Sequence, residues 1–209
     1  MKQNQFILRV GAWSAALATL CLIIQFAIGL SIGAAIADLS SYAPNVVVNL
    51  IQAQSEKIKW LYMFDDIFPV LYFAAFIGLY ELLRERGGIL ARIALIFGAL
   101  TAVADFFENS NVLGLVGAVG VAQTIAPEKM FALNVVTQMK FLFTSVTVFL
   151  FGACLWSESR LRRAASIVAL IFGPVNTLAF IVSGFSLVRI FGMLALLVLT
   201  ALVLGKSEE

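Results

Sequence analysis

The chain has 209 residues, of which 62% are hydrophobic and only 12% are charged, and its net charge is +2. A soluble domain is about 45–50% apolar and about 25% charged. This composition therefore excludes an ordinary soluble domain and predicts a protein embedded in a lipid bilayer. The absence of His excludes His-ligated haem, His-ligated zinc and Ser-His-Asp triads. The basic residues are scattered, which argues against a nucleic-acid partner.

The first apolar segment covers residues 10–37 and follows Lys2 and Arg9. Its last residues, Ala35-Ile36-Ala37, resemble a signal-peptide cleavage site. However, the apolar core of a signal peptide is about 7–15 residues long, and this segment is about twice that length. We therefore predict a retained transmembrane helix.

Further apolar segments along the chain are long enough to cross about 30 Å of hydrocarbon. We predict an all-α fold: one polytopic transmembrane helical bundle over residues 1–209, with about six spanning helices at 10–37, 60–83, 89–109, 130–156, 164–183 and 187–205. The third helix is expected to stop at Asn109-Ser110-Asn111, because Asn and Ser favour helix ends. Residues 112–123 would then be interfacial or re-entrant, and residues 45–59 an interfacial or external helix.

The basic residues predict the orientation, because cytoplasmic loops are rich in Lys and Arg. With both termini cytoplasmic, nine basic residues lie on the inner side: Lys2, Arg9, Arg84, Arg86, Arg92, Arg160, Arg162, Arg163 and Lys206. Four lie on the outer side: Lys57, Lys59, Lys129 and Arg189. This bias favours a multi-pass protein of the cell membrane, such as a bacterial inner membrane, with both ends inside.

Polar residues inside the expected spans are the candidate functional residues, since each ionisable group there costs at least about 2.5–3.5 kcal/mol. Counting helical rise from the expected boundaries places them in the outer half of the membrane. Asp105, Glu108 and Asn109 follow an i, i+3, i+4 spacing and should share one helix face. The candidate polar pocket consists of Asp65, Asp66, Asp105, Glu108, Asn109, Lys140 and Asn176.

The charges of this pocket do not balance. Its four carboxylates against the ammonium of Lys140 would leave a charge of −3 if all were ionised. A medium of low dielectric requires water, a bound cation or protonation of some carboxyl groups to relieve this excess. We expect Lys140 to pair with one of the acids. The alternative is an ion pair that only fixes helix packing.

The sequence also resembles a group of uncharacterised bacterial multi-helix membrane proteins. The resemblance rests on Trp60, Asp65, Pro69 and Tyr72, on the motif Asp105-x-x-Glu108-Asn109, and on the intramembrane Lys140. It covers roughly the second to fourth expected helices. It implies a bundle of transmembrane helices with basic cytoplasmic turns, and it implies no activity.

Three functions remain open from the sequence. The pocket would bind or transport a small cation, a proton or an amphiphile, or the protein would be a non-catalytic scaffold or accessory subunit. An intramembrane enzyme is disfavoured by the lack of His and of a clear nucleophile. We expect no cofactor and no metal, with membrane lipids as partners and an oligomer or a larger membrane complex as a further option.

Overall fold

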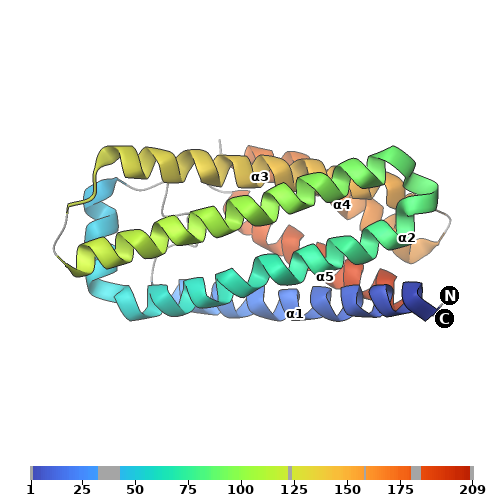
Figure 1. The fold of residues 1–209 in the computed structure, drawn as a ribbon, viewed down its shortest axis with the longest axis horizontal. Coiled ribbons are helices and arrows are strands. Elements are labelled where there is room, and N and C mark those ends of the chain that lie inside the picture. Colours follow the sequence, from blue (N-terminus) through green and yellow to red (C-terminus); the bar gives the residue numbers. More distant parts are fainter. Residues whose placement is uncertain (1, 33–42, 122–123, 158, 180–184, 208–209) are drawn as a thin grey trace.

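The computed structural model describes residues 2–32, 43–121, 124–157, 159–179 and 185–207. These residues form five helices and no strand: α1 (Lys2–Ile32), α2 (Pro44–Gly120), α3 (Pro127–Leu155), α4 (Arg160–Leu178) and α5 (Phe185–Lys206). The predicted all-α fold is confirmed. The helices lie lengthwise beside one another in an elongated bundle, and α1 begins at the same end of the bundle at which α5 ends (Figure 1).

The helix α2 is not straight, and it contains two of the expected spans. Its backbone leaves helical geometry at Gln54 (φ −135°, ψ 22°) and at Gly88 (φ 50°, ψ −122°). The positive φ of Gly88 is a conformation that side-chain-bearing residues rarely adopt. At this point the chain reverses, so that residues 55–87, the first arm, lie beside residues 89–120, the return arm (Figure 1). Residues 44–53 cross the opposite end of the bundle (Figure 1).

The return arm continues past the expected stop at residues 109–111, so that prediction is wrong. Asn111 donates a hydrogen bond from Nδ2 to the carbonyl oxygen of Phe107 (2.7 Å) in the same helix. Its amide is therefore satisfied without ending the helix. Beyond it, Val112, Leu115, Val116 and Val119 pack in one buried cluster with residues of the crossing piece 44–53. Residues 112–120 are thus the last turns of the return arm and not a separate segment.

Four of the described helices are long and apolar enough to cross a membrane: α1, α2, α3 and α5. Large apolar side chains such as Trp13, Leu142 and Leu187 are exposed on their outer faces, as expected of surfaces that face lipid. α4 is not among the four, because it begins with Arg160, Arg162 and Arg163. Parts of the expected segments, at 33–37, 122–123 and 180–183, lie outside the described residues.

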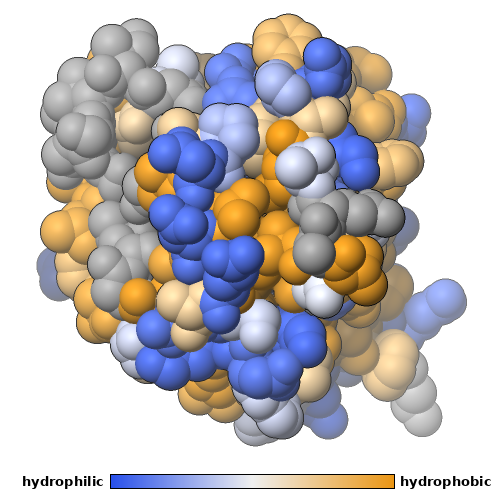
Figure 2. Space-filling model, turned by 90° about the vertical axis from the view of Figure 1, so that its left-hand side faces the viewer, coloured by the Kyte–Doolittle hydropathy of each residue, from blue (hydrophilic) through white to orange (hydrophobic). Residues whose placement is uncertain are grey.

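Polar side chains gather at the end of the bundle where α3 begins. Figure 2 looks onto this end, and hydrophilic residues cover much of it, with hydrophobic residues between and beside them. α3 is also longer than about 30 Å of hydrocarbon requires, since its 29 residues extend about 43 Å. A polar end on long helices is consistent with a bundle that extends beyond the hydrocarbon of a membrane.

Three helices approach one another closely near the other end of the bundle. A Cβ atom added to Gly11 of α1 would lie 2.9 Å from the Cα atom of Gly78 and 3.0 Å from Cδ1 of Leu204. α1, the first arm and α5 therefore approach one another more closely at this point than side chains would allow.

Candidate functional site

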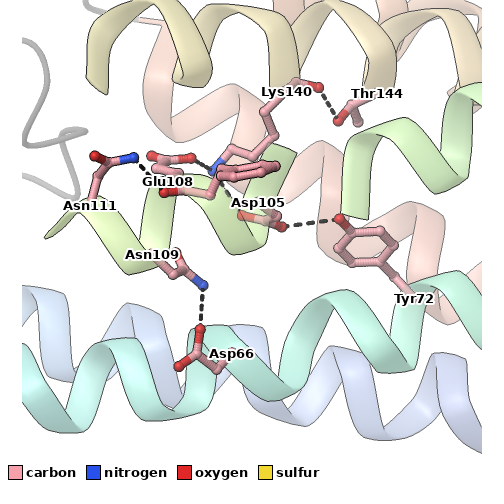
Figure 3. A network of polar contacts seen from close by, with 9 residues as sticks. Asp66, Tyr72, Asp105, Glu108, Asn109, Asn111, Lys140 and Thr144 are labelled. Carbon is pink, nitrogen blue, oxygen red and sulfur yellow. Dashed lines mark hydrogen bonds and ion pairs between the residues drawn. The ribbon is translucent and has the colours of Figure 1, made fainter. Parts of the chain in front are cut away.

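The centre of the candidate site is an ion-pair network around Lys140 of α3 (Figure 3). Its Nζ donates to Oδ1 of Asp105 (3.1 Å) and also pairs with Oε2 of Glu108, both on the return arm of α2. The three side chains are only 14%, 5% and 8% exposed. The i, i+3 spacing places both acids on the face of α2 that meets α3. The predicted pairing of Lys140 is present, with two acids instead of one.

The second carboxylate oxygen of Asp105 is also engaged. The hydroxyl of Tyr72, on the first arm of α2, donates to Oδ2 of Asp105 (3.1 Å). Tyr72 is itself buried, with 5% exposure. It was not among the predicted pocket residues, although it follows Asp65 by seven positions, two helical turns, on the same face of the helix. That spacing is the signal that could have identified it.

The adjacent residues Asp65 and Asp66 have different surroundings. Asp66 accepts a hydrogen bond at Oδ1 from Nδ2 of Asn109 (3.1 Å), which joins the two arms of α2 (Figure 3). Asp65 instead lines the internal cavity of the bundle. Asp66 and Asn109 are therefore next to the cavity but are not part of its wall.

Asn176 does not belong to the cluster, contrary to the prediction. Its Nδ2 donates to the carbonyl oxygen of Phe141 and to Oγ of Ser145, both at 2.9 Å. It is fully buried between α4 and α3. Asn176 therefore forms hydrogen bonds at the contact between these two helices, and it does not line the cavity.

The cavity has a volume of about 250 Å³ and is lined by residues from all five helices. It extends from Ile32 and Leu50, near the end where α3 begins, to Leu155 and Ala165, near the other end. Most of its wall is apolar. Five ionisable groups, other than tyrosine hydroxyls, line it: Asp65, Asp105, Glu108, Lys140 and Arg189.

Arg189 also lines the cavity, although its position in the sequence predicted a place on the outer side of the membrane. It belongs to the first turns of α5, and its guanidinium carbon lies 4.0 Å from the centre of the Phe141 ring. A cation over an aromatic face is stabilised by the ring quadrupole. With Arg189, the cavity wall carries three carboxyl groups and two cations, so its excess negative charge is one unit if all are ionised.

The network lies near the middle of the helices and not close to one end. Asp105 is separated by about 22 Å of helix from Gly120 and by about 26 Å from Gly88. The outer-half depth expected from the sequence was counted as helical rise from the expected boundaries of the spans. Because the return arm continues to Gly120, the network is near the middle of this arm, and its depth in the membrane stays a prediction.

No family model, no curated protein and no solved structure matches this chain. Within the residues that the structure describes, no three His, Cys, Asp or Glu side chains are grouped so that they would hold a metal ion. The chemistry that this site offers is hydrogen bonding and charge pairing at the wall of an apolar cavity.

Proposed function

We propose that this is a multi-pass membrane protein that binds a small amphiphilic molecule in a cavity inside its helical bundle. The observation that carries the proposal is the cavity itself. Most of its wall is apolar, and four charged side chains also line it: Asp65, Asp105, Glu108 and Lys140. Binding sites for small molecules are commonly apolar cavities with a few convergent polar groups. An amphiphile fits this arrangement, because its apolar body fills the cavity and its head contacts the charged groups.

The topology in this proposal has six crossings with both termini in the cytoplasm of a cell membrane. The crossings are α1, the first arm, the return arm, α3, α4 and α5, since each runs along the bundle (Figure 1). Basic residues near the Gly88 reversal and at the start of α4 support a cytoplasmic position for this end. α4 crosses beside α3, and Nδ2 of Asn176 on α4 donates a hydrogen bond to the carbonyl oxygen of Phe141 on α3.

The volume of the cavity limits the ligand. About 250 Å³ is slightly below the 300–1,000 Å³ of typical ligand pockets. This space fits one aromatic ring or a short chain with a head group. It is too small for a phospholipid with two acyl chains.

A second function, a purely structural lock, is favoured by a specific observation. Lys140 pairs with both Asp105 and Glu108, and Tyr72 binds the remaining oxygen of Asp105. A network whose members are satisfied by one another needs no ligand. In that case the protein is a scaffold, and the cavity has no occupant.

Calorimetric titration of the protein in lipid nanodiscs distinguishes the two functions. The probes are 4-phenylbutylamine, 4-phenylbutanol and 4-phenylbutyrate, which differ only in their head groups. Ala75→Phe places a ring in the cavity, whereas Val70→Phe changes a residue of the same helix that is 58% exposed. We expect at least one probe to bind, with binding lost in Ala75→Phe and retained in Val70→Phe. If no probe binds, the structural lock is the correct function.

A further inference from the structure

The carboxyl group of Asp65 differs from the other acids of the cavity wall. It accepts no hydrogen bond and forms no ion pair with any residue that the structure describes. Asp105 and Glu108 are paired with Lys140, and Asp66 accepts from Asn109. A carboxylate in an apolar cavity without such a partner is costly, and a cation that enters the cavity relieves the cost.

The charges of the wall also favour a cation as the ligand. The ammonium group of Lys140 is held by two carboxylates, and Arg189 lies over the Phe141 ring. The wall therefore retains one excess negative charge if all five groups are ionised. The rings of Phe68 and Tyr72 line the same part of the cavity, and aromatic faces attract cations.

A second unpartnered group lines the cavity from α1. Gln25 of α1 is only 9% exposed, lines the cavity, and has no hydrogen-bond partner for its Nε2 atom. It lies one helical turn beyond Cys21, which packs in one cluster with Phe68 and Tyr72. Because α1 and the first arm run in opposite directions (Figure 1), this turn brings Gln25 to the level of Asp65. A buried N–H without an acceptor is a donor available to a ligand.

We infer that the cavity is selective for an organic amine whose head also carries a hydrogen-bond acceptor. Asp65 accepts hydrogen bonds from the ammonium group, and Nε2 of Gln25 donates to an oxygen near the head. The apolar remainder of the ligand lies along the apolar wall between α1, α2 and α5. This inference rests on the proposed function and specifies the ligand class of the same cavity.

The head-group series tests the selectivity. In the parent protein, 4-phenylbutylamine should bind roughly 10- to 150-fold more tightly than 4-phenylbutanol. This ratio corresponds to the free energy that one hydrogen bond to a charged group contributes. Asp65→Asn should remove that preference by lowering the affinity for the amine. Asp66→Asn is the matched control, because Asp66 bonds to Asn109 outside the cavity wall, and it should preserve the preference.

The outcomes separate the inference from the proposed function. If the alcohol or 4-phenylbutyrate binds as tightly as the amine, or if Asp65→Asn keeps the preference, the cavity still binds ligands but the amine selectivity is wrong. If Asp66→Asn lowers amine affinity as much as Asp65→Asn, the effect comes from the general electrostatic potential and the assignment to Asp65 is wrong. If none of the three probes binds, the proposed function fails as well.

The role of Gln25 is tested with 2-(benzyloxy)ethylamine, in which an ether oxygen replaces the third methylene of 4-phenylbutylamine, counted from the nitrogen. The ether should bind about 2- to 12-fold more tightly than the hydrocarbon analogue, the value of one neutral hydrogen bond. Gln25→Leu should abolish this difference by lowering the affinity for the ether. An equal affinity of the two amines for the parent protein would refute the contribution of Gln25.

Discussion

Replacing Lys140 with Met should strongly destabilise the protein, because it leaves two carboxylates in the bundle without their cation. The side chains of Asp105 and Glu108 are only 5% and 8% exposed, so water replaces the lost ammonium poorly. Tyr72 continues to donate to Asp105, whereas the ion pair of Glu108 with Lys140 is lost. Removing one partner of a buried ion pair costs about 3–5 kcal/mol. For a chain of this size, that loss lowers the melting temperature by about 6–20 °C.

Melting temperatures in detergent measure this effect, and Lys129→Met is the matched control. Lys129 is an exposed cation of the same helix, so its replacement should change the melting temperature little. Adding Asp105→Asn and Glu108→Gln to Lys140→Met removes the stranded charges and should recover most of the lost stability. If Lys140→Met melts within about 2 °C of the parent, which corresponds to less than about 1 kcal/mol, or if the triple variant shows no recovery, the buried ion-pair network is not what stabilises the bundle.

Three further predictions concern the cavity wall, the reversal and the topology. Tyr72→Phe removes the hydrogen bond to Asp105 and should cost about 1.5–3 kcal/mol in the free energy of unfolding, measured by denaturant titration. Gly88→Ala should cost about 1–3 kcal/mol in the same titration, because φ is 50° there, and an unchanged stability would argue against the tight reversal. A Cys replacing Lys129 should react with an impermeant thiol reagent in intact cells and a Cys replacing Arg84 should not, once the native cysteines have been replaced. Reaction of the latter from outside would disprove the six-crossing topology.

The sequence predicted the helices and the central ion pairs because both depend on local spacing. Apolar segments of span length indicate helices, and the i, i+3 spacing of Asp105 and Glu108 places both on one face. Lys140 was predicted as their partner because an ammonium group in an apolar segment requires an acid nearby. The contacts Lys140–Asp105 and Lys140–Glu108 are both present.

The remaining features depend on contacts between distant segments. Asn109 was expected to end a helix, but its amide finds an acceptor on Asp66, 43 residues earlier in the chain. Asn176 was assigned to the pocket by its depth, but the direction of its side chain is set by its packing against α3. Arg189 was counted on the outer side because it stands at the start of the last expected span, and only the assembled bundle shows that it lines the cavity. Spacing along one segment contains none of this information.

The reversal at Gly88 separates the acids of the polar network from their cation along the chain. The pairs Tyr72–Asp105 and Asp66–Asn109 are centred on Gly88, so both lie in register between the two arms of α2. Lys140 belongs to the next helix, α3. The hairpin of α2 therefore carries Asp105 and Glu108 without the ammonium group that pairs with them, and the packing of α3 against the hairpin supplies it.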